Sequence, residues 1–238
     1  MRPGVLAACV AVALPACASP ASGAADPVGQ GRALYIESCA GCHGDDARGR
    51  HGQAPALLGV GAQSADFYLS TGRMPLADPR AEPVRSPPSY TAAERRALVA
   101  YVASLGGPRV PRVDPGRGSI AEGQELFTSH CAGCHQIVGR GGVVPGGVAP
   151  ALQEATPQQI AEAVRIGPYL MPAFPERQID QRELESIARY VLSTRNPPNR
   201  GGWGIGNIGP IPEGMVAWLL AGTALLLVVR LLGKRAEP

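Results

Sequence analysis

The five-residue word CAGCH occurs twice in the chain, at Cys39–His43 and at Cys131–His135. Two cysteines separated by two residues and followed at once by a histidine form the pattern for covalent attachment of a c-type haem. The thiols bond to the vinyl groups of the porphyrin, and the imidazole binds the iron as an axial ligand. We therefore expect two covalently bound haem c groups, with His43 and His135 on the irons and thioether bonds to Cys39, Cys42, Cys131 and Cys134.

Other uses of paired cysteines fit this sequence less well. A thioredoxin-like motif needs a βαβ context, and none is visible around either word. A zinc site built from all four thiols would not require a histidine behind each pair. The two remaining cysteines, Cys9 and Cys17, lie in an apolar leader, so no cysteine is left over for a disulfide framework.

Methionines supply candidates for the opposite axial position of each iron. Of the four methionines, one starts the chain and one lies in an apolar run near its end. Met74 and Met171 remain, one after each haem word, and each precedes a proline. A thioether ligand raises the reduction potential, which suits electron transfer. We predict Met74 and Met171 as iron ligands, with core methionines as the alternative, and neither His51 nor His130 as a ligand.

The haem words belong to a segment of about 80 residues that is written twice, small for a self-sufficient core. GRALYIESCAGCHG matches GQELFTSHCAGCHQ, and the word APAL follows both. Each repeat is expected to contain a helix, the haem word, an irregular loop, Met-Pro and a final helix. Final helices are predicted over Thr91–Leu105 and Asp180–Thr194, because Thr91 and Asp180 each have a glutamate three residues later, the capping-box spacing.

This order of elements resembles the class I cytochrome c fold, in which the first and last helices cross. The resemblance also implies that the carbonyls of Pro55 and Pro150 accept hydrogen bonds from the proximal histidines; the alternative is two ordinary loop prolines. It places the helix crossings at Gly31, Tyr35 and Tyr101 in the first repeat and at Gly123, Phe127 and Tyr190 in the second. The predicted fold class is all-α: two tandem class I cytochrome c domains plus one C-terminal transmembrane helix.

Both ends of the chain carry membrane-related patterns. Residues 1–24 have the layout of a secretory signal peptide, with lipidation at Cys17 as an alternative because LPAC resembles a lipoprotein box. Near the other end, Ile211–Leu232 is long enough to cross about 30 Å of hydrocarbon; the alternative is a buried core helix. The basic flank that follows predicts a cytoplasmic C-terminus, with the haem domains on the extracytoplasmic side of the cell membrane.

These patterns set the expected domain organisation. The signal peptide is followed by cytochrome c domains at 25–106 and 119–196, linkers at 107–118 and 197–210, the membrane span at 211–232 and a tail at 233–238. The second linker contains apolar residues that a solvated tether would not need, so we expect it to pack on a neighbouring subunit. Acidic and basic side chains balance in both repeats, and nucleic-acid binding has no support.

Over its whole mature length, the chain resembles the dihaem cytochrome c subunit of the actinobacterial cytochrome bc complex, a menaquinol–cytochrome c reductase. The two repeats and the stretch GGWGIGNIGPIPEGMVAWLLAGTALLLVVRLLGKR carry this resemblance. It implies an electron carrier, without a substrate-binding catalytic site of its own, inside a quinol–cytochrome-c reductase. The implied partners are cytochrome b, the Rieske iron–sulfur protein as donor and the copper-centre subunit of a haem–copper oxidase as acceptor.

Two other functions remain open at this point. One is a stand-alone, membrane-anchored dihaem shuttle for another oxidase or reductase. The other is a dihaem peroxidase, which needs one iron with an open or displaceable site and is disfavoured by the two Met-Pro pairs.

Overall fold

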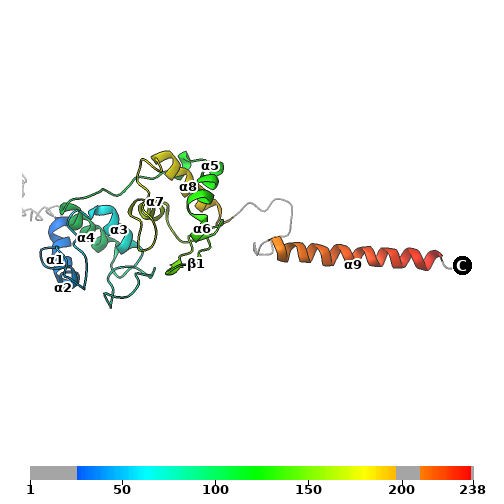
Figure 1. The fold of residues 1–238 in the computed structure, drawn as a ribbon, viewed down its shortest axis with the longest axis horizontal. Helices are drawn as coiled ribbons and strands as arrows, with labels where there is room; N and C mark the ends of the chain where they lie inside the picture. The colour runs from blue at the N-terminus through cyan, green and yellow to red at the C-terminus, as the bar shows by residue number, and fades with distance from the viewer. Residues whose placement is uncertain (1–25, 197–209, 237–238) are drawn as a thin grey trace, which may run out of the picture. The chain divides into compact units, whose positions relative to one another are not determined.

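The computed structural model describes residues 26–196 and 210–236 and divides the chain into two units (Figure 1). The first unit ends at Leu192 and holds both haem words; the second begins at Ser193 and contains the C-terminal helix. The predicted signal peptide, with Cys9 and Cys17, lies outside the described residues, as does the linker over 197–209.

The first unit is built almost entirely from helices. The first repeat contains α1 (Pro27–Ser38), α2 (Ala40–His43), α3 (Gly61–Ser70) and α4 (Ala92–Ser104). After the short 3-10 helix η1 (Pro115–Arg117), the second repeat contains α5 (Ile120–His130), α6 (Ala132–His135), α7 (Pro157–Ile166) and α8 (Gln181–Ser193). An antiparallel hairpin of β1 (Gly142–Val144) and β2 (Gly147–Ala149) pairs Val143 with Val148. The helical architecture confirms the predicted fold class.

Both predicted capping boxes are present at the start of the final helices. The Thr91 amide donates to Glu94 Oε2 at 2.7 Å, and the Glu94 amide donates to Thr91 Oγ1 at 3.3 Å. Asp180 and Glu183 make the same reciprocal pair at 2.7 and 2.8 Å. Each N-cap satisfies helix N–H groups that have no intrahelical partner, a contribution of about 1 kcal/mol.

Two glycines allow the first and last helices of each repeat to cross in close contact. A Cβ on Gly31 would lie 1.9 Å from the Ala97 carbonyl oxygen, and one on Gly123 would lie 2.0 Å from that of Ser186. Aromatic rings pack beside each crossing, at 5.0 Å between the centroids of Tyr35 and Tyr101 and 5.4 Å between Phe127 and Tyr190. Both predicted crossings are therefore confirmed.

Gly123→Ala is expected to destabilise the protein, because the new methyl group collides with the α8 backbone. Overpacking of this kind costs about 1–3 kcal/mol, and a rigid backbone partner places the cost at the upper end. Gly133→Ala is the matched control, since a Cβ there meets no atom within 4 Å. Urea unfolding followed by circular dichroism should show a lower midpoint for Gly123→Ala alone; equal midpoints would contradict the close crossing.

The stretch between haem word and Met-Pro was predicted to be an irregular loop, and this was wrong in both repeats. It contains α3 in the first repeat and α7 in the second. Helix α7 begins with a capping box, Thr156 with Gln159, and has Pro157 in its first turn. Helix α3 has no side-chain cap, and Val60 precedes it.

Helices α3 and α7 pack against each other and join the two repeats. Gln159 Nε2 donates to Ser70 Oγ at 3.1 Å, and Arg85 Nη1 donates to Gln159 Oε1 at 3.3 Å. The segment between the repeats is attached to the second repeat by hydrogen bonds. Its Pro111 and Arg112 carbonyls accept from side chains of that repeat. The two repeats thus share polar contacts as well as a covalent connection.

The second unit contains helix α9 (Pro210–Ala236). Within it, Gly214–Lys234 is long and apolar enough to cross a membrane, and none of it is buried in the described part of the protein. This stretch overlaps the predicted span and is consistent with a single membrane anchor. The alternative of a buried core helix is not supported.

Candidate haem sites

Each haem word folds as the end of one helix followed by a single helical turn. Cys39 is the C-cap residue that follows α1, and its carbonyl accepts the His43 amide at 2.9 Å. Cys131 is the C-cap residue that follows α5, and its carbonyl accepts the His135 amide at the same distance. Residues three and four apart lie on one face of a helix, so this turn presents both thiols and the imidazole to the same side.

Both histidines are oriented by a proline carbonyl, as the family resemblance implied. His43 Nδ1 lies 2.9 Å from the Pro55 oxygen, and His135 Nδ1 lies 3.0 Å from the Pro150 oxygen. A carbonyl only accepts, so Nδ1 carries the proton and Nε2 keeps a lone pair for a metal. Burial lowers the pKa of His135, which favours its neutral, ligating form.

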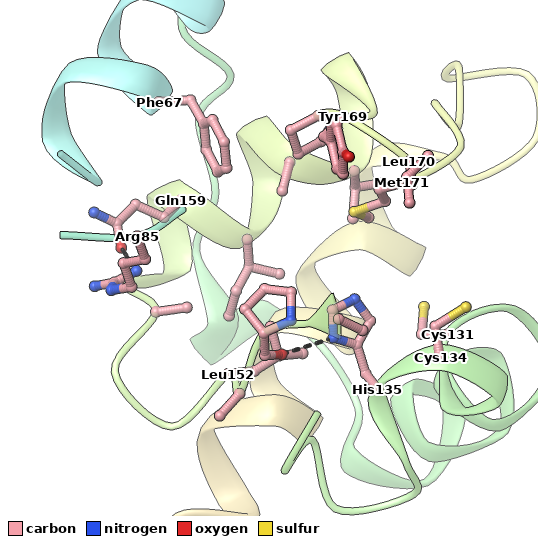
Figure 2. A pocket seen from close by; sticks show the side chains of 18 of the residues that line it. Phe67, Arg85, Cys131, Cys134, His135, Leu152, Gln159, Tyr169, Leu170 and Met171 are labelled. Carbon is pink, nitrogen blue, oxygen red and sulfur yellow. Dashed lines mark hydrogen bonds between the residues drawn. The ribbon is translucent and has the colours of Figure 1, made fainter. Parts of the chain in front are cut away.

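In the second repeat, His135 and Met171 line the same apolar cavity of about 380 Å³ (Figure 2). Cys131 and Cys134 lie together at one side of it. Most of the wall is aliphatic or aromatic and comes from the hairpin, α7, the Met171 loop and α8, including Val148, Leu152, Ile160, Val164, Phe174, Ile187 and Val191. The structure thus brings together all four residues that the sequence assigned to the second haem.

In the first repeat, Met74 and Cys39 pack against the same apolar cluster, which includes Tyr35 and Leu98. The Met74 amide donates to the Tyr68 carbonyl at 3.2 Å, so the end of α3 positions the Met74 loop. The other two histidines have different surroundings: His51 is exposed in a turn, and the His130 ring meets Phe174 edge-on, 5.9 Å between centroids.

The cysteines have properties opposite to those of redox-active thiols. Burial raises the pKa of Cys131 to about 11 and also raises that of Cys39. Thioredoxin-like motifs instead lower the pKa of the attacking thiol. Among the described residues, which include all four motif cysteines, no three His, Cys, Asp or Glu side chains gather closely enough to bind a metal ion. Neither the dithiol nor the zinc alternative is supported.

Sequence reasoning assigned each haem to its own repeat and missed residues that cross between them. Phe67, Tyr68, Arg73 and Arg85 belong to the first repeat yet line the cavity of the second. Gln159 of α7 lies beside Arg85. No local spacing links these residues to Cys131, because the contact depends on how α3 packs against α7.

The second cavity fits a haem c on several independent features. Two thiols lie at one side, an imidazole nitrogen and a thioether lie on its walls, and the remaining lining is mostly apolar. Arg73 Nη1 is buried there without a hydrogen-bond partner among the described residues, which leaves a donor for an anionic group. Such a donor set suits a bound redox group whose iron is held from both sides.

Comparison with known proteins agrees with this geometry. The family described as cytochrome c matches residues 28–106, and the family described as cytochrome C oxidase, cbb3-type, subunit III matches residues 118–191. A Cbb3-type cytochrome c oxidase subunit CcoP from Azospirillum is 29% identical over 183 residues, covering 68% of this chain and 60% of the relative.

Two more similar relatives are each named cytochrome bc1 complex cytochrome c subunit. The protein from Corynebacterium diphtheriae is 35% identical over 228 residues, covering 87% of this chain and 80% of its own length. The protein from Mycobacterium tuberculosis is 37% identical over 216 residues, covering 87% and 77%. With two cytochrome c domains and an apolar C-terminal helix, the chain belongs to the family of cytochrome bc1 complex cytochrome c subunits, which are electron-transfer components of an oxidoreductase complex.

Proposed function

We propose that this protein binds two haem c groups and carries electrons from the Rieske iron–sulfur protein toward the copper centre of a haem–copper oxidase. The observation that carries this proposal is the second cavity, where His135 and Met171 share one apolar space with Cys131 and Cys134 at its side. The equivalent set in the first repeat is Cys39, Cys42, His43 and Met74. Haem c, when bound, supplies a one-electron ferric–ferrous couple.

The residues of the chain orient this couple and exclude other chemistry. The Pro150 carbonyl holds the His135 ring with Nε2 free, and Met171 lines the same cavity. These two side chains would hold the iron of a bound haem and would leave no position for a substrate. The apolar wall excludes water and lowers the local dielectric. A peroxidase, which needs an open or displaceable axial position, is therefore not the function we propose.

The proposed membrane topology rests on the charges beside the apolar helix, and the proposed order of electron transfer rests on the family role. The C-terminal basic residues Arg230, Lys234 and Arg235 favour a cytoplasmic tail, which places the haem domains outside the cell membrane. By the family role, the first domain receives electrons and the second delivers them. We also propose that the apolar residues Trp203, Ile205 and Ile208, before α9, contact cytochrome b or the oxidase.

The test is mild detergent extraction of the intact membrane assembly through an affinity tag on this chain. A Rieske protein, cytochrome b and oxidase subunits should co-purify, and the material should consume oxygen when supplied with menaquinol. The pyridine haemochrome assay should give two haems per chain, and Cys131→Ala with Cys134→Ala should leave one. Recovery of the dihaem protein alone, without menaquinol-driven respiration, would instead identify a stand-alone shuttle.

A further inference from the structure

One side of the second haem cavity is built by the first repeat. Figure 2 shows Arg85 and Phe67 on the side of the cavity away from Cys131 and Cys134. The guanidinium carbon of Arg73 lies 5.0 Å from the centroid of the Phe67 ring, and Arg73 also lines the cavity. This wall therefore carries two arginines. Both belong to the first repeat, whereas the cysteines and the histidine of the cavity belong to the second.

The two arginines lack anionic partners of matching strength. Arg73 Nη1 is buried without a hydrogen-bond partner among the described residues, and the Arg73 guanidinium lies over the Phe67 ring. Arg85 donates to two uncharged oxygens, the side-chain Oε1 of Gln159 and the main-chain carbonyl oxygen of Glu154. Its ion pair with the Glu154 carboxylate is long, 3.9 Å, and that carboxylate is 85% exposed. Partly buried cations without paired anions are costly, so this wall favours a carboxylate ligand.

The attachment chemistry fixes which part of a haem faces this wall. Thioether bonds form at the two vinyl groups, and the two propionate groups extend from the opposite edge of the porphyrin. Cys131 and Cys134 lie at one side of the cavity, so they would hold the vinyl edge of a bound haem there and its propionates would face the other side. We propose that Arg73 and Arg85 of the first repeat bind the propionate carboxylates of the haem held by the second. This rests on the proposed function.

Guanidinium groups suit this task because their planar N–H fork matches a carboxylate in a bidentate pair. The contact has a redox consequence, since positive charge near the iron favours the ferrous form over the more positive ferric form. The contact also has a structural consequence, because Arg73 is adjacent in sequence to Met74, the proposed ligand of the first haem. The same contact thus connects the potential of one haem to the loop that ligates the other.

The experiment is a redox titration of the full-length holoprotein in detergent, carrying Arg73→Gln, Arg85→Gln or both. The potential of the second haem is identified as the one that Met171→His displaces. We expect each single variant to shift the ferric–ferrous equilibrium of the second haem at least threefold toward ferric, about 28 mV at 59 mV per tenfold. The double variant should shift it about tenfold, and the first haem should change less.

Two controls separate charge from packing. Arg85→Lys keeps the charge but loses the fork, so it should retain most of the wild-type potential. Arg177→Gln removes an exposed arginine of the second repeat and should leave both potentials unchanged. The proposal is overturned if Arg85→Lys shifts the second haem as far as Arg85→Gln, or if the double variant matches wild type. A haem count below two per chain in the parent protein would instead reject the proposed function on which it rests.

Discussion

Met171→His is expected to lower the reduction potential of the second haem, and Met74→His that of the first, each with little effect on the other. A thioether stabilises ferrous iron, whereas imidazole favours the ferric state. Axial ligands set haem potentials over about 0.8 V, so a fall on the order of 0.1 V or more is expected. Met171 already lines the same cavity as His135.

The measurement is a spectroscopic redox titration of the full-length holoprotein with two resolved one-electron steps. Each variant serves as the control for the other, because both replace a methionine that precedes a proline by histidine, but in different repeats. The step displaced by Met171→His should be the one that Met74→His leaves in place. A variant with wild-type potentials, or one that displaces both steps equally, would remove that methionine from the ligand set.

Much of each repeat could be predicted because its signals are local. Thr91 and Asp180 cap their helices through a glutamate three residues later, and the sequence spacing alone indicates this. The haem word is similar, since its three chemical groups lie within five residues. The close crossings at Gly31 and Gly123 came from the family resemblance, because only a packed partner makes a helical glycine necessary.

The failures have physical reasons as well. Helix α7 had a usable signal, since Thr156 and Gln159 form a capping box after the APAL word. Its polar residues suggested a solvent-facing surface and gave no sign of a contact between the repeats. In the structure Gln159 and Glu162 of this helix are buried. Helix α3 offered no cap, and the hydrogen bond from Gln159 to Ser70 spans 89 positions. Contacts between the repeats depend on how two folded surfaces pack together. The hydrophobic periodicity within one repeat does not predict that packing.

Glu162 is the buried group at this contact whose protonation should affect stability most. Its side chain is fully buried, Gln158 Nε2 donates to Oε1 at 3.2 Å, and Oε2 has no partner among the described residues. Burial, and then the Asp66 carboxylate of α3, raise the pKa of Glu162 from 4.5 to about 9. At neutral pH the folded protein therefore holds a proton on Glu162.

The sign of the pH dependence follows from proton counting. Between pH 4.5 and about 9 the folded state keeps this proton and the unfolded state does not. Unfolding then releases a proton, so Glu162 reduces the free energy of unfolding as pH rises, by up to about 1.4 kcal/mol per pH unit. Glutamine resembles the protonated carboxyl and cannot ionise, so Glu162→Gln should remove this slope.

We expect Glu162→Gln to match the parent protein near pH 4 and to be more stable than it by more than about 1 kcal/mol at pH 8. Urea unfolding of the full-length holoprotein, repeated at several pH values, measures the difference. Glu125→Gln, which changes an exposed glutamate of α5, should follow the parent at every pH. Asp66→Asn should end the slope at a lower pH, because it removes the second cause of the raised pKa while burial remains. A gap between parent and Glu162→Gln that stays constant from pH 5 to pH 8 would mean that Glu162 is ionised in the folded protein, and that its carboxylate is paired at the contact between the repeats.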